Sequence, residues 1–79
     1  MTQLTEEQEE ELLDRLLGGN PANELEALAV KAIQHFNREF PTPRTQEMLG
    51  LRDAMAVLIV EGTIHYDPVK GTFKRVFRA

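Results

Sequence analysis

The absence of cysteine from the 79-residue chain constrains its fold more than any other single feature. A chain this short has room for one core and buries only about 60% of the surface that its unfolded form exposes. Small domains usually compensate with disulfides, a metal or a second subunit. Disulfides and thiolate zinc sites are excluded without thiols. We therefore expect a single domain over residues 1–79, held by helix packing or by self-association as a homodimer.

The chain also lacks the features of a membrane or secreted protein. No stretch approaches the roughly 18 consecutive apolar residues that span a bilayer. The first residues, MTQLTEEQEEELL, are acidic and have no basic segment followed by an apolar one, as a signal peptide would. These observations predict a cytoplasmic protein with no membrane partner.

Charge is divided unevenly along the chain. Residues 1–37 carry eight acids and two bases, a net charge of −6, whereas residues 38–79 carry seven bases and five acids, a net charge of +2. The last twelve residues hold four bases and no acid. This asymmetry favours a partner that is attracted to one end of the molecule.

The first helix is predicted over residues 6–17. Thr5 and Gln8 have the spacing of a capping box, leucines at 12, 13, 16 and 17 form one stripe, and Gly18-Gly19 is a stop signal. With its flanks it makes an acidic N-terminal unit, residues 1–19. Its run of glutamates over residues 6–11 is typical of a solvated helix start, and it could also dock on a basic partner.

A second helix is predicted to begin at Asn20-Pro21, which have the order of an N-cap followed by proline. Apolar residues then recur at spacings of three and four: Leu25, Leu28, Ala29, Ala32, Ile33 and Phe36. Phe40-Pro41 disfavours further helix, so we expect the end at about residue 38 or 39.

The next segment allows two interpretations. Either one helix runs from about 44 to 61, or a short helix over 43–49 turns at Gly50 into a second over 51–61. Thr42 before Pro43 is one cap candidate and Thr45 is another. The predicted inner face is Met48, Leu51, Met55 and Leu58. Residues 56–60 are apolar all round, which indicates burial on more than one side.

The C-terminal segment predicts a β-hairpin. Residues 63–66 and 72–77 are rich in strand-forming residues, and Asp67-Pro68-Val69-Lys70-Gly71 between them is typical of a turn. Alternation places Phe73, Arg75 and Phe77 on one face of the second strand. The phenylalanines either cover the core or, interleaved with bases, stack on nucleic acid.

Enzymatic chemistry is not indicated. The chain has neither serine nor cysteine, and its five glycines form no phosphate-binding or dinucleotide-binding pattern. His35 and Glu39 have the spacing of a helical metal pair, but two histidines without further clustered ligands are more often surface or interface residues. We therefore predict a non-enzymatic protein with no cofactor and no metal.

The predicted order of elements, three or possibly four helices followed by a hairpin, is an α+β arrangement that resembles the winged helix-turn-helix superfamily between Leu25 and Val76. Met48-Leu49-Gly50-Leu51 looks like the turn of the motif. Residues 58–64 resemble the helix end that leads into the first wing strand, and residues 67–71 are similar to a wing tip. The resemblance implies a winged-helix-like core over residues 20–79 and a small transcription regulator that binds duplex DNA.

The segment that would be the recognition helix, residues 51–61, offers only Arg52, Asp53 and Glu61 among apolar residues, which is a poor set for reading bases. We therefore expect mostly phosphate contacts, from the loop before this helix and from a basic wing. The candidate residues are Arg44, Gln46, Arg52, Lys70, Lys74, Arg75 and Arg78.

A second hypothesis is a protein-interaction module, an inhibitor or adaptor of the kind that phages and mobile elements encode. It rests on the acidic N-terminal helix and on a segment, residues 51–60, that is more apolar than so small a core should need. Such a protein would bind a partner protein through the acidic helix and the apolar helix surface and would act as a homodimer. Self-association with no other binding role, through the first or the third helix, is a third hypothesis.

Overall fold

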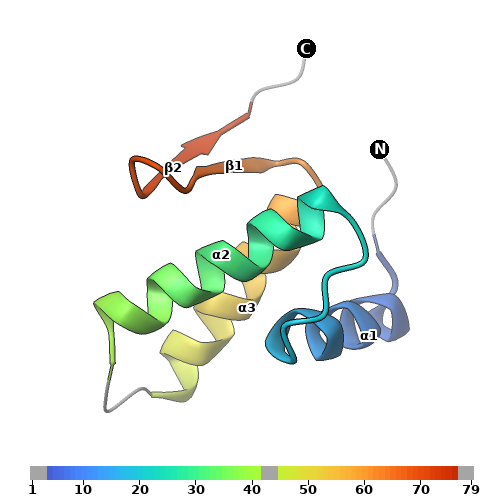
Figure 1. The fold of residues 1–79 in the computed structure, drawn as a ribbon. Helices are drawn as coiled ribbons and strands as arrows, with labels where there is room; N and C mark the ends of the chain where they lie inside the picture. The colour runs from blue at the N-terminus through green and yellow to red at the C-terminus, as the bar shows by residue number, and fades with distance from the viewer. Residues whose placement is uncertain (1–3, 42–44, 77–79) are drawn as a thin grey trace.

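The computed structural model describes residues 4–41 and 45–76 and confirms the predicted fold class. Three helices, α1 (Glu6–Leu17), α2 (Glu24–Glu39) and α3 (Gln46–Val60), are followed by an antiparallel hairpin of β1 (Ile64–Asp67) and β2 (Thr72–Arg75). Figure 1 shows this order from the blue N-terminal helix to the red strand β2.

Helix α1 has the predicted bounds and the predicted cap. The Gln8 backbone N–H donates to the Thr5 hydroxyl over 3.2 Å, and the Thr5 N–H donates to the Gln8 side chain over 3.0 Å. Gly19 has a φ of 73°, which glycine adopts without strain, and the chain reverses there.

The predicted start of the second helix was wrong by three residues. Asn23, not Asn20, is the N-cap of α2, and its side chain accepts the Glu26 N–H over 2.8 Å. Asn20 instead closes the end of α1, where its backbone N–H donates to the Arg15 carbonyl over 2.8 Å and its side chain donates to Gly18. The asparagine before Pro21 is therefore engaged by the preceding helix.

Helix α3 is one continuous helix that begins after the Thr45 cap and runs through Gly50. The two-helix interpretation and the turn expected at residues 48–51 were therefore wrong, because a single glycine costs a helix only about 1 kcal/mol, less than the tertiary packing of a helix supplies. The predicted apolar face is correct only in part: Met55 is partly buried and packs against the core, whereas Leu51 is 66% exposed, and the buried residues are Ala56, Val57 and Ile59. The other predicted cap, Thr42-Pro43, lies outside the described residues.

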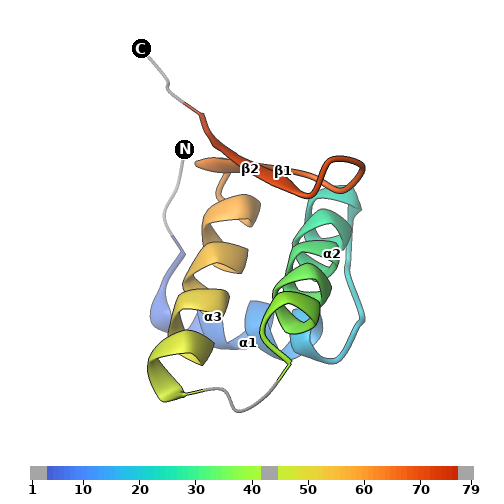
Figure 2. The same cartoon turned by 90° about the vertical axis from the view of Figure 1, so that its left-hand side faces the viewer.

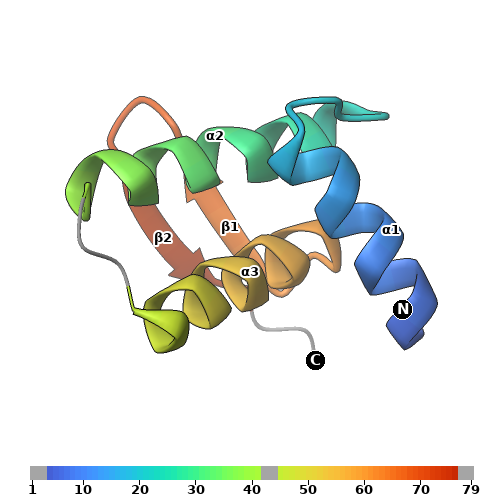
Figure 3. The same cartoon turned by 90° about the horizontal axis from the view of Figure 1, so that it is seen from below.

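Helices α2 and α3 lie side by side and run in opposite directions (Figure 3). The hairpin covers one face of this pair, and α1 crosses the other face near the start of α2 and the end of α3 (Figures 1 and 2). The core between these layers contains the buried residues Leu12, Leu16, Ala29, Ala32, Ile33, Ala56, Val57, Ile59 and Tyr66.

The hairpin confirms the predicted turn. The Asp67 carboxylate accepts the backbone N–H groups of Val69 and Lys70, and the Gly71 N–H donates to the Asp67 carbonyl over 2.7 Å. Gly71 has a φ of 68°, and a Cβ there would lie 3.1 Å from the His35 ring, so the turn rests closely on α2. Glycine meets both conditions without strain.

Tyr66 attaches the hairpin to the helices and is 2% exposed. Its cross-strand partner Phe73 is 41% exposed, and the centroid of its ring lies 4.9 Å from that of Tyr66 and 5.8 Å from that of His35. Phe73 therefore covers the edge of the core, as one of the two sequence interpretations expected. Phe77 lies outside the described residues.

Replacing Gly50 with alanine is expected to stabilise the protein by about 0.5–1 kcal/mol, because glycine in a helix interior loses more backbone entropy on folding. A Cβ at this exposed position meets nothing within 4 Å. Equilibrium unfolding in urea measures the change. A loss of stability would show that α3 is not continuous at this point.

Candidate functional site

Five of the seven residues predicted to contact nucleic acid lie in the described part of the chain; Arg44 and Arg78 lie outside it. Gln46 is exposed at the first position of α3, and Lys70, Lys74 and Arg75 are exposed on the hairpin. The start of α3 and the hairpin turn lie far apart, on opposite sides of α2, in Figures 1 and 2. The fold therefore does not gather these residues into one surface.

Arg52 is engaged within its own helix. Its Nε and one terminal nitrogen each lie 3.0 Å from an Asp53 carboxylate oxygen, and its side chain is only 12% exposed. A guanidinium held by a neighbouring carboxylate is poorly placed to bind a phosphate as well. The neighbouring acid, visible in the sequence, was the signal for this pairing.

The bases of β2 divide between the two faces of the hairpin. Arg75 is opposite Ile64, on the same side as the buried Tyr66, whereas Lys74 is opposite His65 on the side that faces away from the helices. Among the five predicted contacts that the structure describes, only Lys70 and Lys74 are therefore exposed cations on the turn or the outer face.

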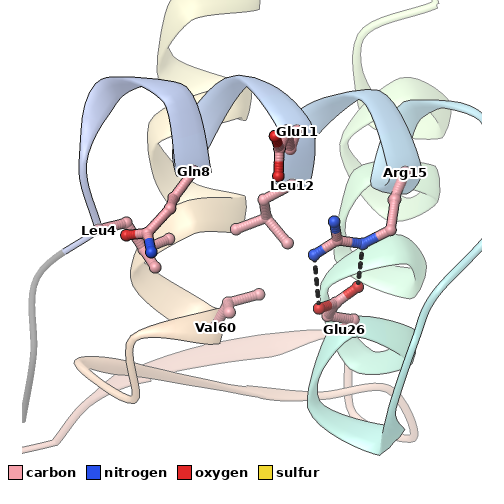
Figure 4. Close-up of a pocket in the computed structure, with 7 residues that line it drawn as sticks. All are labelled: Leu4, Gln8, Glu11, Leu12, Arg15, Glu26 and Val60. Atoms are coloured by element: carbon pink, nitrogen blue, oxygen red, sulfur yellow. Dashed lines mark hydrogen bonds and ion pairs between the residues drawn. The ribbon is translucent and has the colours of Figure 1, made fainter.

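A bidentate ion pair joins α1 to α2 (Figure 4). Arg15 donates from two nitrogens to the two carboxylate oxygens of Glu26, over 3.1 and 3.0 Å, and the Ala22 N–H also donates to this carboxylate. Glu26 is the only buried charged residue within the described segments, at 5% exposure. The sequence does not predict this pair, because nothing in a pattern shows that two residues eleven positions apart will meet.

The ion pair changes the titration of both partners. The hydrogen bonds from Arg15 lower the pKa of Glu26 below its ordinary value of 4.5, outweighing the opposing effect of burial, and the Ala22 N–H adds to the lowering. The hydrogen bonds to Glu26 likewise raise the pKa of Arg15. The carboxylate of Glu26 therefore stays ionised where it is buried.

Beside this pair lies a cavity of about 210 Å³ between α1, α2 and the end of α3 (Figure 4). Its lining is Leu4, Gln8, Glu11, Leu12, Arg15, Glu26 and Val60. The polar side chains of Gln8, Arg15 and Glu26 are already hydrogen-bonded, to Thr5 or to one another. The cavity therefore offers a ligand few polar groups that are ready to bind it.

A larger hollow, of about 380 Å³, lies between α1 and α3. Leu13 and the α3 residues Ala54, Val57 and Leu58 form its apolar floor, and Glu9, Asp53 and Glu61 add one carboxylate from α1 and two from α3. We refer to these seven residues as the acid-rimmed groove. The acidic first helix and the apolar third helix are each evident in the sequence, and the fold brings them together.

Metal chemistry finds no support in the described segments, where no three histidine, aspartate or glutamate side chains gather into a group that could hold an ion. His35 does approach Glu39, with Nε2 3.8 Å from a carboxylate oxygen. The His35 ring also lies 5.7 Å from that of Tyr66, measured between centroids, so its contacts are those of a residue at the hairpin–helix interface.

Among the described helices, none has the length and apolar character needed to cross a membrane. Comparison of the chain with protein-family models, with curated proteins and with solved structures finds no match. Of the two hollows described above, the acid-rimmed groove is the larger and has the more apolar lining.

The ion pair predicts a pH dependence of stability. Because the pKa of Glu26 is lowered in the folded state, its contribution is fully present above pH 4.5 and is lost as the pH falls through the folded-state value. Glu26→Gln is expected to destabilise the protein at neutral pH and to flatten the decline of unfolding free energy below pH 4.5. Urea titrations between pH 3 and 7, with Glu24→Gln as the exposed control, test this; equal slopes for wild type and Glu26→Gln would contradict it.

Proposed function

We propose that this chain is a non-enzymatic protein-interaction module, and that its docking surface is the acid-rimmed groove. The occupant is a segment of a partner protein that combines apolar residues with positive charge. The observation that carries the proposal is the open apolar floor between α1 and α3, with carboxylates from both helices around it.

The apolar composition of the C-terminal half of α3 supports a groove that is covered by a partner. A helix that is apolar all round is normally buried on more than one side. Ala56 and Ile59 are fully buried, whereas Leu58 is only partly buried and Ala54 is exposed in the groove. A partner in the groove would cover the side of α3 that this chain leaves open.

The charges define the chemistry of that partner. Glu9, Asp53 and Glu61 surround an apolar floor, and complementary charges around an apolar contact increase the association rate and exclude wrong partners. Because Asp53 is already paired with Arg52, Glu9 and Glu61 are the main anchors for incoming cations.

Glu61 is unfavourably placed for the free protein. It is the C-cap of α3, at the negative end of the helix dipole, and the last turn before it, Val57-Leu58-Ile59-Val60, contains no base. A cation is the favoured charge at this end of a helix. A positively charged partner would supply the missing cation, which gives Glu61 a reason to be there.

Glu61→Lys is therefore expected to stabilise the free protein by about 0.3–1 kcal/mol while it abolishes partner binding. Urea unfolding measures the first effect. The loss of partner binding is measured with a displayed library of natural protein segments. Segments that bind the wild-type protein are selected, and their binding to the Glu61→Lys variant is then compared.

The same selection needs a blocked groove and a matched control. Ala54→Arg places a bulky cation on the groove floor, whereas Glu10→Lys changes the charge of an exposed residue on α1 that does not line the groove. Selected segments that still bind the Glu10→Lys variant but no longer bind the Ala54→Arg variant support the proposal. If no enriched segment depends on Ala54, the groove is not the docking surface. The mass of the protein in solution, over a range of concentrations, tests the predicted homodimer separately.

A second candidate function is duplex DNA binding through the hairpin, as the resemblance to winged helix-turn-helix proteins implies. The specific observation in its favour is the exposure of Lys70 at the turn and of Lys74 on the outer face. Two such contacts predict weak binding that depends on salt. For each phosphate contact, the logarithm of the association constant should fall by about 0.9 when the salt concentration rises tenfold.

Fluorescence anisotropy with a random duplex between 20 and 200 mM salt tests the DNA proposal. Lys70→Glu/Lys74→Glu is expected to abolish binding at low salt, and Lys31→Glu, on α2, serves as the control for net charge. Binding that survives the hairpin variant would contradict this candidate.

A further inference from the structure

We infer that the segment held in the acid-rimmed groove is an amphipathic α-helix with cations on both flanks of its apolar stripe, two of them seven or eight residues apart. This inference rests on the proposed function and deepens it by naming the shape and charge spacing of the occupant. It follows from the backbone of the groove walls, the length of the groove floor and the placement of the carboxylates.

The walls of the groove favour a helical occupant. Both α1 and α3 are helices whose interior backbone groups are hydrogen-bonded within the helix. An extended segment in the groove would find no row of backbone partners for its own N–H and C=O groups, and covering such groups without partners is costly. A helix satisfies its own backbone and can cover an apolar floor.

The placement of the carboxylates points the same way. Glu9 comes from α1, and Asp53 and Glu61 come from α3, so carboxylates flank the floor on two sides. A helix can present an apolar stripe with cations on both flanks, because successive residues are about 100° apart around its axis. In an extended strand the residues next to those on the floor point directly away from it.

The groove floor sets the spacing of the cations. Asp53 and Glu61 are eight positions apart on α3, which corresponds to about 12 Å along the helix axis. A helix lying along α3 would place one cation at Glu61 and a second, seven or eight residues away, at the Oδ2 atom of Asp53, because the Arg52 nitrogens contact Oδ1. Ala54 is the small residue between them, and a small side chain lets two helices approach more closely.

The probe is a synthetic peptide of about 16 residues, long enough to form a helix when rich in alanine and leucine. It carries a leucine stripe, lysines seven residues apart on one flank and one lysine on the other. A second peptide has proline at its centre, and a third has glutamate in place of every lysine. Binding of each to the full chain is measured by fluorescence anisotropy, and helicity by circular dichroism.

We expect the lysine peptide to bind and to become more helical. The proline peptide should bind about a hundredfold more weakly, because proline interrupts the helix, and the glutamate peptide should not bind. Ala54→Arg should abolish binding and Glu10→Lys should leave it unchanged. Glu9→Lys/Glu61→Lys should abolish binding of the lysine peptide and give the protein a measurable affinity for the glutamate peptide.

Failure of this inference is distinguishable from failure of the proposed function. If the proline peptide binds as well as its parent, or if the display selection yields groove-dependent segments that are not helical or not basic, the helix inference is wrong and the docking function stands. If Ala54→Arg weakens the binding of neither a designed peptide nor any selected segment, the helix inference and the docking function are both wrong.

Discussion

The close packing of α2 against α3 is the interaction on which the rest of the molecule depends. Ala29 and Ala32 on α2 and Ala56 on α3 are each fully buried, and small side chains at these positions allow the two helices to lie against each other along their length. Neither α1 nor the hairpin rests on one helix alone: each contacts both members of the pair. A change that separated α2 from α3 would therefore displace every other element.

The two layers that cover the α2–α3 pair, α1 and the hairpin, expose charges of opposite sign. Helix α1 and the end of α3 place carboxylates around an apolar groove, while the hairpin on the other face exposes lysines. The Arg15–Glu26 pair ties α1 to the start of α2, and this connection helps to hold Glu9 and Leu13 beside α3. An ion pair of this kind contributes through the geometry that it specifies as well as through its strength. The groove thus depends on a contact that lies outside it.

Local signals explain which parts of the fold could be predicted from the sequence. The capping box of Thr5 and Gln8, the cap at Thr45 and the turn at residues 67–71 involve groups within four residues of one another, so their patterns are readable directly. The start of α2 was missed because two asparagines competed for the cap and the end of α1 engaged the first. Leu51 was wrongly placed on the inner face of α3 because residues 56–60 are apolar all round and give no periodicity that shows which side is buried.

The α+β order of elements, the acidic first helix, the apolar third helix and the basic hairpin can all be derived from the amino-acid sequence, because they follow from composition and short-range hydrogen bonding. The Arg15–Glu26 pair, the near burial of the Arg52 side chain and the meeting of Glu9 and Glu61 at one apolar floor arise only in the folded chain. These contacts depend on how the helices pack. Packing is set by the summed complementarity of side chains from distant segments, which no local pattern encodes.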